Sequence, residues 1–400
     1  MGRISKEFKY LGIGAAYITL NLPLRPETPT LKPFERRIFY SILQKRKPFD
    51  EYMEMCLYSR KYNGFEGGYY SSGKVIFDTT AKKGHYNTYP QKNSPLFGQG
   101  IVKQLVAMWK ALDRPNNFLA VNMGAGNGIM DRDILMYTYK YHRDFFESLK
   151  YVIVEISKEL MERQEGTIAS VKGQDPFIKA KIMQHINFIN RSAVNIEFDE
   201  PITGCFISNE LLDNLPVKKL FWDGEKYHEI YVSPKQYAES SIFFCETKGR
   251  LSSSKLKDYL KFRMDKYKMP QDSYLYVNLN AIDLLQNISK NLKRGYVITI
   301  DCGKEDLDKY IKTGNIIRTY GYGISEEYEG NPYYNPGNLD IAASVDFGAL
   351  MLYGEAFGLK NIGCYQQNEY FDKILLTPLN KWKRNSKYYR VLIQSKNASL

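Results

Sequence analysis

The sequence predicts an α/β protein with a doubly wound, mostly parallel β-sheet, because three features occur together. From Asn116 onward, short apolar segments rich in β-branched residues alternate with longer helical patterns, as in sheets whose strands are buried on both faces. A glycine-rich turn follows the first of these segments and precedes a helical stretch, which is typical of a βαβ unit. The 400 residues are 44% hydrophobic and 25% charged, a composition that can bury a core of this kind.

The first part of the chain predicts helices and an extended segment. In Lys32–Ser59, apolar residues recur mostly three and four positions apart, which predicts two helices with a break near Pro48. Gly64–Thr80 combines glycine and serine pairs with an alternating apolar stretch, which indicates an extended or hairpin segment. After a polar loop, Ile101–Leu112 predicts a helix that ends before Pro115.

Four strands are predicted in the rest of the chain, at Phe118–Met123, Tyr151–Glu155, Gly204–Ser208 and Tyr296–Ile300. Each is short, apolar and rich in β-branched residues, as buried parallel strands are. Between Phe221 and Asp272 the pattern changes to short strands and then to a stretch rich in serine and lysine. This change predicts an insertion in the sheet domain.

Composition excludes several classes of protein. The five cysteines are odd in number and far apart, and the four histidines form no pair with metal-ligand spacing, so we expect neither a disulfide framework nor a protein-made metal site. No segment approaches the ~18 apolar residues of a membrane-spanning helix. We therefore expect a cytoplasmic protein, or one of the mitochondrial matrix if the chain is eukaryotic, with a weak presequence as the minority interpretation.

The charge balance points weakly to acidic partners. There are 56 lysines and arginines against 44 aspartates and glutamates, which gives +12 and favours nucleic acid, membrane surfaces or acidic proteins by long-range attraction. No basic run is longer than three residues, so an ordinary solvated surface explains the charge equally well.

The turn VNMGAGNGIM places Gly124, Gly126 and Gly128 between a strand and a helix, where a ligand approaches the backbone closely. The spacing is GxGxG, and Glu155 follows at a longer interval than the roughly 20 residues typical of dinucleotide sites. This pattern disfavours a dinucleotide and suits S-adenosylmethionine, whose ribose hydroxyls need an acceptor such as Glu155. We expect Ala125 and Ile156 beside the same ligand. The alternative is a tight turn and a surface charge without a ligand.

The segment ISNELLDNLPV at 207–217 resembles a signature of the MidA-like S-adenosylmethionine-dependent methyltransferases. The chain is identified as a divergent member because further segments resemble this family and occur in its order. They are Leu57–Gly73, Ser94–Gln99, the glycine turn, Val154–Gln164, Arg294–Gly303 and Asn335–Leu350.

The resemblance implies a Rossmann-like class I methyltransferase domain at 116–220 and 273–400, with bound S-adenosylmethionine. It also implies a cap on the substrate cleft, built from residues 1–115 and from the insertion at 221–272. Asn209, Glu210 and Asp213 would stand at the end of a strand, where ligands bind in open α/β sheets. The first two would also border the methyl donor, and His85 is a further catalytic candidate.

The chain departs from the family pattern at polar positions. Gln91, Asn122 and Asn278 stand where glutamates are usual, His85 replaces an acid, Cys302 a tyrosine and Ser344 a histidine. We expect these positions to face the acceptor. Because charges are lost there, we expect an acceptor that differs from the arginine methylated by the mitochondrial family member that assists assembly of respiratory complex I.

The resulting functional hypothesis is a methyltransferase that acts on a protein or peptide, for example a ribosomally made peptide. Three alternatives remain open: an arginine methyltransferase for complex I assembly, a nucleic-acid methyltransferase supported only by charge and tyrosine content, and a donor-binding assembly factor without catalysis. Nucleic acid and membrane are not the expected partners, and the sequence leaves the oligomeric state undefined.

Overall fold

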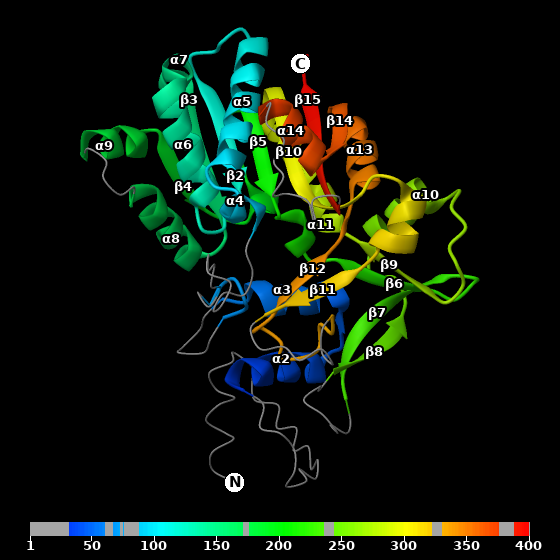
Figure 1. Ribbon diagram of the computed structural model, residues 1–400. Coiled ribbons are helices and arrows are strands. Elements are labelled where there is room, and N and C mark those ends of the chain that lie inside the picture. The colour runs from blue at the N-terminus through cyan, green and yellow to red at the C-terminus, as the bar shows by residue number, and fades with distance from the viewer. Residues whose placement is uncertain are drawn as a thin grey trace. The chain divides into compact units, whose positions relative to one another are not determined.

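A central sheet carries its strands in the order β4-β3-β2-β5-β10-β15-β14 (Figure 1). The computed structural model describes residues 32–60, 67–72, 75, 88–170, 176–235, 244–321, 330–375 and 388–399. From β4 to β10 neighbouring strands are parallel, whereas β15 is antiparallel to both β10 and β14. The strands are β2 (Phe118–Met123), β3 (Leu149–Glu155), β4 (Ile186–Asn190), β5 (Ile202–Asn209), β10 (Leu292–Lys304), β14 (Lys360–Gln366) and β15 (Tyr389–Lys396).

The predicted α/β class is confirmed, since the four predicted strands are β2, β3, β5 and β10. Their apolar character follows from burial on both faces. Phe118 and Ala120 of β2 belong to one buried cluster, whereas Val121 and Met123 belong to the cluster on the opposite face. Because the side chains of such a strand point alternately into two cores, the strand has no exposed face and its sequence is a continuous apolar run.

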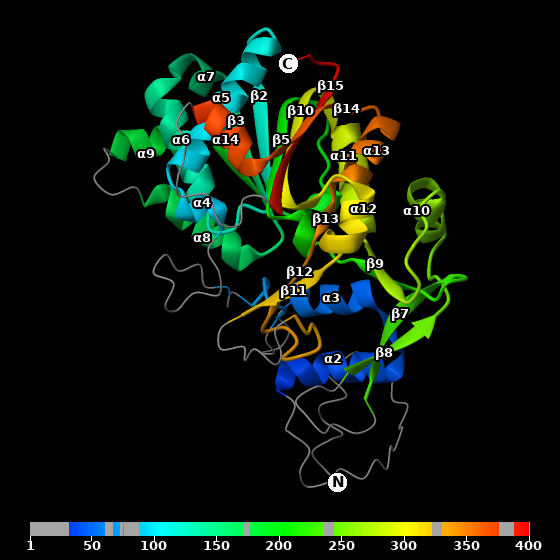
Figure 2. The ribbon, with the colours of Figure 1, turned by 45° about the vertical axis from the view of Figure 1, so that its right-hand side comes forward.

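Helices cover both faces of the central sheet (Figures 1 and 2). On one face lie α5 (Leu96–Ala111), α6 (Ile129–Tyr141), α7 (Arg143–Ser148) and α14 (Gln367–Leu375). On the other face lie α11 (Leu279–Asn291) and α13 (Phe347–Ala356). The helices α8 (Lys158–Ala169) and α9 (Pro176–Gln184) connect β3 to β4 and contribute Ile168 and Ile182 to the first of these faces. Coverage of both faces makes the sheet doubly wound.

A second, antiparallel sheet lies beside the central one and has the order β1-β7-β6-β9, with β8 paired to β7. Its strands are β1 (Lys47–Pro48), β6 (Lys218–Trp222), β7 (Tyr227–Pro234), β8 (Phe244–Gly249) and β9 (Ser273–Val277). The helices α2 (Pro33–Gln44) and α3 (Phe49–Tyr58) pack near it, and the predicted break near Pro48 is confirmed. Figure 2 shows them on the same side as β11 (Ile317–Tyr320) and β12 (Asp340–Ala343).

The second sheet extends past both ends of the predicted insertion at 221–272, because β6 begins at Lys218 and β9 ends at Val277. The predicted helix at Ile101–Leu112 is the larger part of α5, which packs on the central sheet through Ile101 and Leu105. Apolar spacing identifies a helix face but does not say which core that face joins. Most of the predicted extended segment at Gly64–Thr80 lies outside the described residues.

The remaining described elements include α10 (Ser254–Met264) of the inserted region and the short helix α4 (Tyr89–Lys92). In the described ranges, no helix is both long enough and apolar enough to cross a membrane. Within the same ranges, no group of three or more histidine, cysteine or acidic side chains is arranged to hold a metal ion.

Candidate active site

A cavity of about 650 Å³ lies at the carboxyl-terminal edge of the parallel strands. Its lining includes the turns after β2, β3 and β5, together with Cys302 near the end of β10. Because β15 runs antiparallel, its first residue Tyr389 pairs with Cys302 and reaches the same edge. This edge is where open α/β sheets bind ligands. Side chains from α3, α4, β11 and β12 complete the lining: Tyr58, Tyr89, Arg318 and Asp340.

The turn after β2 has a backbone conformation that favours glycine. Gly124, Gly126 and Gly128 have φ values of 72°, 59° and 77°, in the left-handed region that side chains disfavour. A Cβ on Gly128 would lie 2.9 Å from Cα of Gln164 in α8. Gly124, Ala125 and Gly126 line the cavity, whereas Gly128 is the N-cap residue of α6 and does not.

Glu155 is the last residue of β3 and is buried, with 5% of its surface exposed. Its Oε1 accepts a hydrogen bond from the backbone N–H of Ser157 (3.0 Å), and its Oε2 accepts one from Nε2 of Gln164 (2.9 Å). Gln164 also donates to the carbonyl of Gly126 (3.0 Å) and so connects the turn to the carboxylate. Burial raises the pKa of Glu155 to about 7, although both hydrogen bonds oppose the shift.

Glu210 follows β5 and has a φ of 50°, which is uncommon for a residue other than glycine. Its N–H donates to the carbonyl of Ile300 (2.9 Å). Its Oε1 accepts hydrogen bonds from the backbone of Tyr89 (3.2 Å) and from Asn209 Nδ2 (3.3 Å), and its Oε2 accepts one from the Tyr389 hydroxyl (3.4 Å). The left-handed conformation and these donors hold the carboxylate in the cavity. Burial raises the pKa of Glu210.

Three more carboxylates stand near Glu210. Asp213 and Asp340 line the cavity, and Asp301 lies behind it, where Oδ2 accepts the backbone N–H groups of Leu212 (2.8 Å) and Asp213 (3.3 Å). Burial raises the pKa of Asp301 and of Asp340 to about 7. Burial together with the neighbouring carboxylates raises the pKa of Asp213 well above its usual range.

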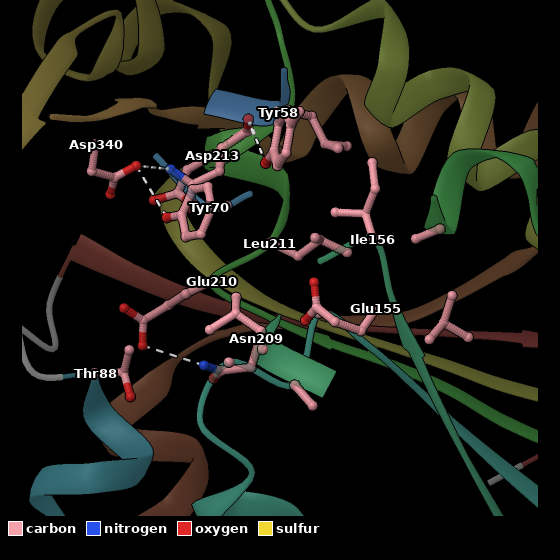
Figure 3. A pocket seen from close by; sticks show the side chains of 18 of the residues that line it. Tyr58, Tyr70, Thr88, Glu155, Ile156, Asn209, Glu210, Leu211, Asp213 and Asp340 are labelled. Carbon is pink, nitrogen blue, oxygen red and sulfur yellow. Dashed lines mark hydrogen bonds between the residues drawn. The ribbon is translucent and has the colours of Figure 1, made fainter. Parts of the chain in front are cut away.

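Two polar atoms of the lining have unused hydrogen-bonding capacity. Oδ1 of Asn209 and Oδ1 of Asp213 are buried, and neither has a hydrogen-bond partner among the described residues. Buried polar atoms are normally paired, and unpaired ones in a cavity fit a polar ligand. In the view of Figure 3, Glu155 and Ile156 lie on one side of the cavity, and Glu210, Asp213 and Asp340 on the other. The lining therefore has two separate acidic regions.

The cavity brings together most of the residues predicted from the sequence. Its lining includes Gly124, Ala125, Gly126, Glu155, Ile156, Asn209, Glu210 and Asp213. Gly128 stands behind the turn, and His85 lies outside the described residues. Sequence reasoning did not single out Asp340, Arg318 or Tyr389. Asp340 lies in a segment that resembles the family, but the positions of Arg318 and Tyr389 follow from long-range strand pairing, which leaves no local signal.

The expectation that departures from the family pattern face the acceptor is wrong for four positions. Gln91, Asn122, Asn278 and Ser344 do not line the cavity. Asn122 donates to Asp131 beneath the glycine turn (2.6 Å), and Asn278 caps α11 by accepting the N–H of Ala281 (2.8 Å). These side chains therefore support local structure. Cys302 is the one described departure that lines the cavity.

A doubly wound sheet with this strand order, and with its cavity at the glycine turn, defines a Rossmann-like S-adenosylmethionine-dependent methyltransferase. A family model described as "Putative S-adenosyl-L-methionine-dependent methyltransferase" matches residues 100–365. The chain belongs to this family and is a divergent MidA-like member, as the resemblance predicted.

Several known proteins are similar to the chain. It is 30% identical to the mitochondrial protein arginine methyltransferase NDUFAF7 homolog of Drosophila melanogaster, over 79% of this chain and 68% of that protein. It is 24% identical to the Caenorhabditis elegans homolog, over 75% of this chain and 66% of that protein. The match thus spans about two thirds of these relatives.

A crystal structure of a Burkholderia thailandensis protein bound to S-adenosyl-homocysteine has the same fold. It has a TM-score of 0.71 and 19% identity, and the match covers 93% of this chain and 96% of that one. A second structure from that organism gives a TM-score of 0.68 at 20% identity, with the same coverage. The family model identifies this chain as an enzyme whose methyl donor is S-adenosylmethionine, and the fold is that of the Burkholderia protein.

Proposed function

We propose that the chain methylates a basic nitrogen in a side chain of a protein or peptide, and that an arginine guanidinium suits the cavity best. The observation that carries this proposal is the group of carboxylates of Glu210, Asp213 and Asp340 at one end of the cavity. Carboxylates orient a guanidinium through paired hydrogen bonds and offset the cost of removing it from water. The names of the relatives, which are protein arginine methyltransferases, support the same acceptor.

The proposed donor site lies at the other end of the cavity. Gly124, Ala125 and Gly126 would border S-adenosylmethionine, and Glu155 would accept hydrogen bonds from the ribose hydroxyls. Glu155 fits this role because Ser157 and Gln164 hold its carboxylate in place while it faces the cavity. Asn209 would contact the methyl donor or the acceptor, because its Oδ1 has no hydrogen-bond partner among the described residues.

Bound S-adenosylmethionine supplies an electrophilic methyl group, which an acceptor nitrogen attacks in line with the departing sulfur. Glu210 and Asp213 would hold the N–H groups of the acceptor so that its lone pair faces the donor. One N–C bond forms, one S–C bond breaks, and the nitrogen loses a proton. The carboxylate of Asp213, when ionised, is placed to take this proton because it lines the cavity among the groups proposed to hold the acceptor.

This proposal departs from the expectation of a non-arginine acceptor. That expectation rested on glutamates lost at positions 91, 122 and 278, and these positions do not line the cavity. Glu210, Asp213 and Asp340 do line the cavity. Their carboxylates can pair with a guanidinium, so the reason for excluding an arginine acceptor no longer applies. No comparable feature of the cavity favours a nucleic-acid acceptor.

The proposal is tested by incubating the purified chain with isotopically labelled S-adenosylmethionine and a cell lysate. Mass spectrometry then identifies the labelled species and the modified atom. We expect label on arginine side chains of proteins, and a sharp loss of label with Glu210→Gln. Glu147→Gln, on α7 at an exposed ion pair with Lys181, is the matched control and should retain activity. Label confined to RNA, or donor binding without any labelled product, would overturn the proposal.

A further inference from the structure

Arg318 of β11 lines the same cavity as the carboxylates, yet it has no ion-pair partner among the described residues. Its single hydrogen bond there runs from Nη1 to Sγ of Cys302, over 3.3 Å. The side chain is half-buried. A guanidinium carries five N–H donors, so most of the donors of this lining side chain have no partner among the described residues.

Two other partly buried arginines, Arg263 and Arg132, are paired with carboxylates. Arg263 forms two hydrogen bonds with Asp346, at 2.8 and 3.0 Å, and Arg132 contacts Asp133 at 2.8 Å. The Cys302 thiol does not replace such a partner, because burial raises its pKa to about 11 and keeps it neutral. A half-buried guanidinium without a carboxylate in hydrogen-bond contact loses hydration and gains little in return, which is typical of a position that awaits a ligand.

We propose that Arg318 binds a carboxylate of the substrate that lies next to the methylated residue. The substrate would then carry a cation for the acidic end of the cavity and an anion for Arg318. The inference rests on the proposed function and adds a determinant of substrate choice. Arg318 and Asp213 line the same cavity, and the guanidinium opposes the rise that burial causes in the pKa of that carboxyl. A single small segment of the substrate can therefore contact both groups.

Two sources of the carboxylate fit this chemistry: an aspartate or glutamate side chain beside the acceptor, and the free carboxyl terminus of a peptide. A third possible source is the amino-acid carboxylate of the methyl donor, which would belong to the donor and not to the peptide. The three differ in which component loses affinity when Arg318 is changed, so they are separated by measuring peptide and donor binding independently.

The test uses short peptides with a central arginine flanked by glutamate, glutamine or lysine, each with blocked ends. The glutamine-flanked peptide is also made with a free carboxyl terminus. Calorimetry measures peptide binding in the presence of S-adenosylhomocysteine, and mass spectrometry measures methyl transfer separately. The variants are Arg318→Ala, Arg318→Glu and, as a matched change of charge, Lys150→Glu. Lys150 is exposed at the amino end of β3, on the edge of the sheet opposite the cavity.

We expect the native chain to bind a peptide with a carboxylate about tenfold more tightly than the blocked glutamine-flanked peptide. Arg318→Ala should remove this preference, Arg318→Glu should transfer it to the lysine-flanked peptide, and Lys150→Glu should change nothing. Whether the side-chain or the terminal carboxylate is preferred identifies the source. The affinity for S-adenosylhomocysteine should stay within about twofold throughout.

An unchanged peptide preference in Arg318→Ala overturns the inference. So does a loss of S-adenosylhomocysteine affinity in that variant, because it assigns Arg318 to the donor. Methylation of all peptides alike leaves the proposed function intact and refutes the role of Arg318. Carboxylate-dependent binding that requires Arg318, without methyl transfer, supports the role of Arg318 and refutes the proposed function. Absence of both binding and transfer refutes both.

Discussion

The hydroxyl group of Tyr70 donates a hydrogen bond to Oδ1 of Asp340 over 3.0 Å, although the two residues are 270 positions apart. The backbone carbonyl of Tyr70 accepts a hydrogen bond from Oγ of Ser157 (2.9 Å), next to the Glu155 region. One residue of the N-terminal part therefore contacts both ends of the cavity. Figure 3 shows the side chains of Tyr70 and Asp340 joined by this hydrogen bond.

Tyr70→Phe should shift the pH dependence of methyl transfer. Burial raises the pKa of Asp340 to about 7, and the Tyr70 hydroxyl opposes that shift. Without the hydroxyl the pKa rises further, so the ionised form that holds a cationic acceptor appears at higher pH. The rising limb of kcat/KM against pH should move to higher pH. Tyr267→Phe, which removes an exposed bond to Asp308, is the control and should leave the limb in place.

Donor affinity should weaken as pH falls below neutrality. The ribose hydroxyls need the ionised form of Glu155, and burial raises its pKa to about 7. Binding of S-adenosylhomocysteine should be about tenfold weaker at pH 6 than at pH 8, because the protonated form accumulates below the pKa. Calorimetry across this range checks it. Glu155→Gln should bind weakly at every pH, and a pH dependence that survives in this variant would assign it to another group.

The sequence predicted most of the fold because its information is local. The apolar strands β2, β3, β5 and β10 are recognisable from their own residues, as is the helix break near Pro48. The strands β14 and β15 were not predicted, and β14 lacks the apolar run of a buried strand because its side chains are mostly half-exposed. Antiparallel pairing with β10 is what carries Tyr389 to the cavity.

The candidate site also contains residues that could be predicted from the sequence and residues that could not. Gly124, Gly126, Glu155 and Glu210 stand at ends of strands that could be predicted, so their convergence followed from the parallel sheet. The error concerned the departures from the family pattern. A changed polar residue such as Asn122 was interpreted as facing the acceptor, although its side chain lies fully buried beneath the turn and pairs with Asp131. Sequence position alone does not give the direction of a side chain.

Gly126→Val should abolish binding of the methyl donor while the chain stays folded. A valine at a φ of 59° is strained, at a cost of order 1–3 kcal/mol, and it places methyl groups beside the cavity. Gly166→Val is the matched control, because a Cβ at this position of α8 meets no atom within 4 Å. Calorimetry measures donor affinity, and circular dichroism checks the fold. Native affinity in Gly126→Val would exclude the turn from the donor site.

Asp213→Ala should lower turnover at least about tenfold, equal to about 1.4 kcal/mol of transition-state stabilisation, with little effect on donor affinity. The reason is that Asp213 lies among the carboxylates proposed to hold the acceptor and has a free Oδ1. Asp258→Ala, on the inserted helix α10, serves as the control. Full activity of Asp213→Ala would mean that its charge only stabilises the turn after β5.

The second sheet should depend strongly on one half-buried lysine, Lys218. Nζ of Lys218 lies 2.9 Å from Asp50 and 3.1 Å from Glu229, and the side chain of Glu229 is fully buried. Lys218→Met leaves the Glu229 carboxylate without its cation, so we expect a loss of about 3–5 kcal/mol in the free energy of unfolding. Lys255→Met breaks the exposed pair with Asp283 and should cost at most about 1 kcal/mol. Urea unfolding of both variants gives the comparison. If the two losses are equal, Glu229 is held by Ser252, which also donates to it, and the lysine contributes little.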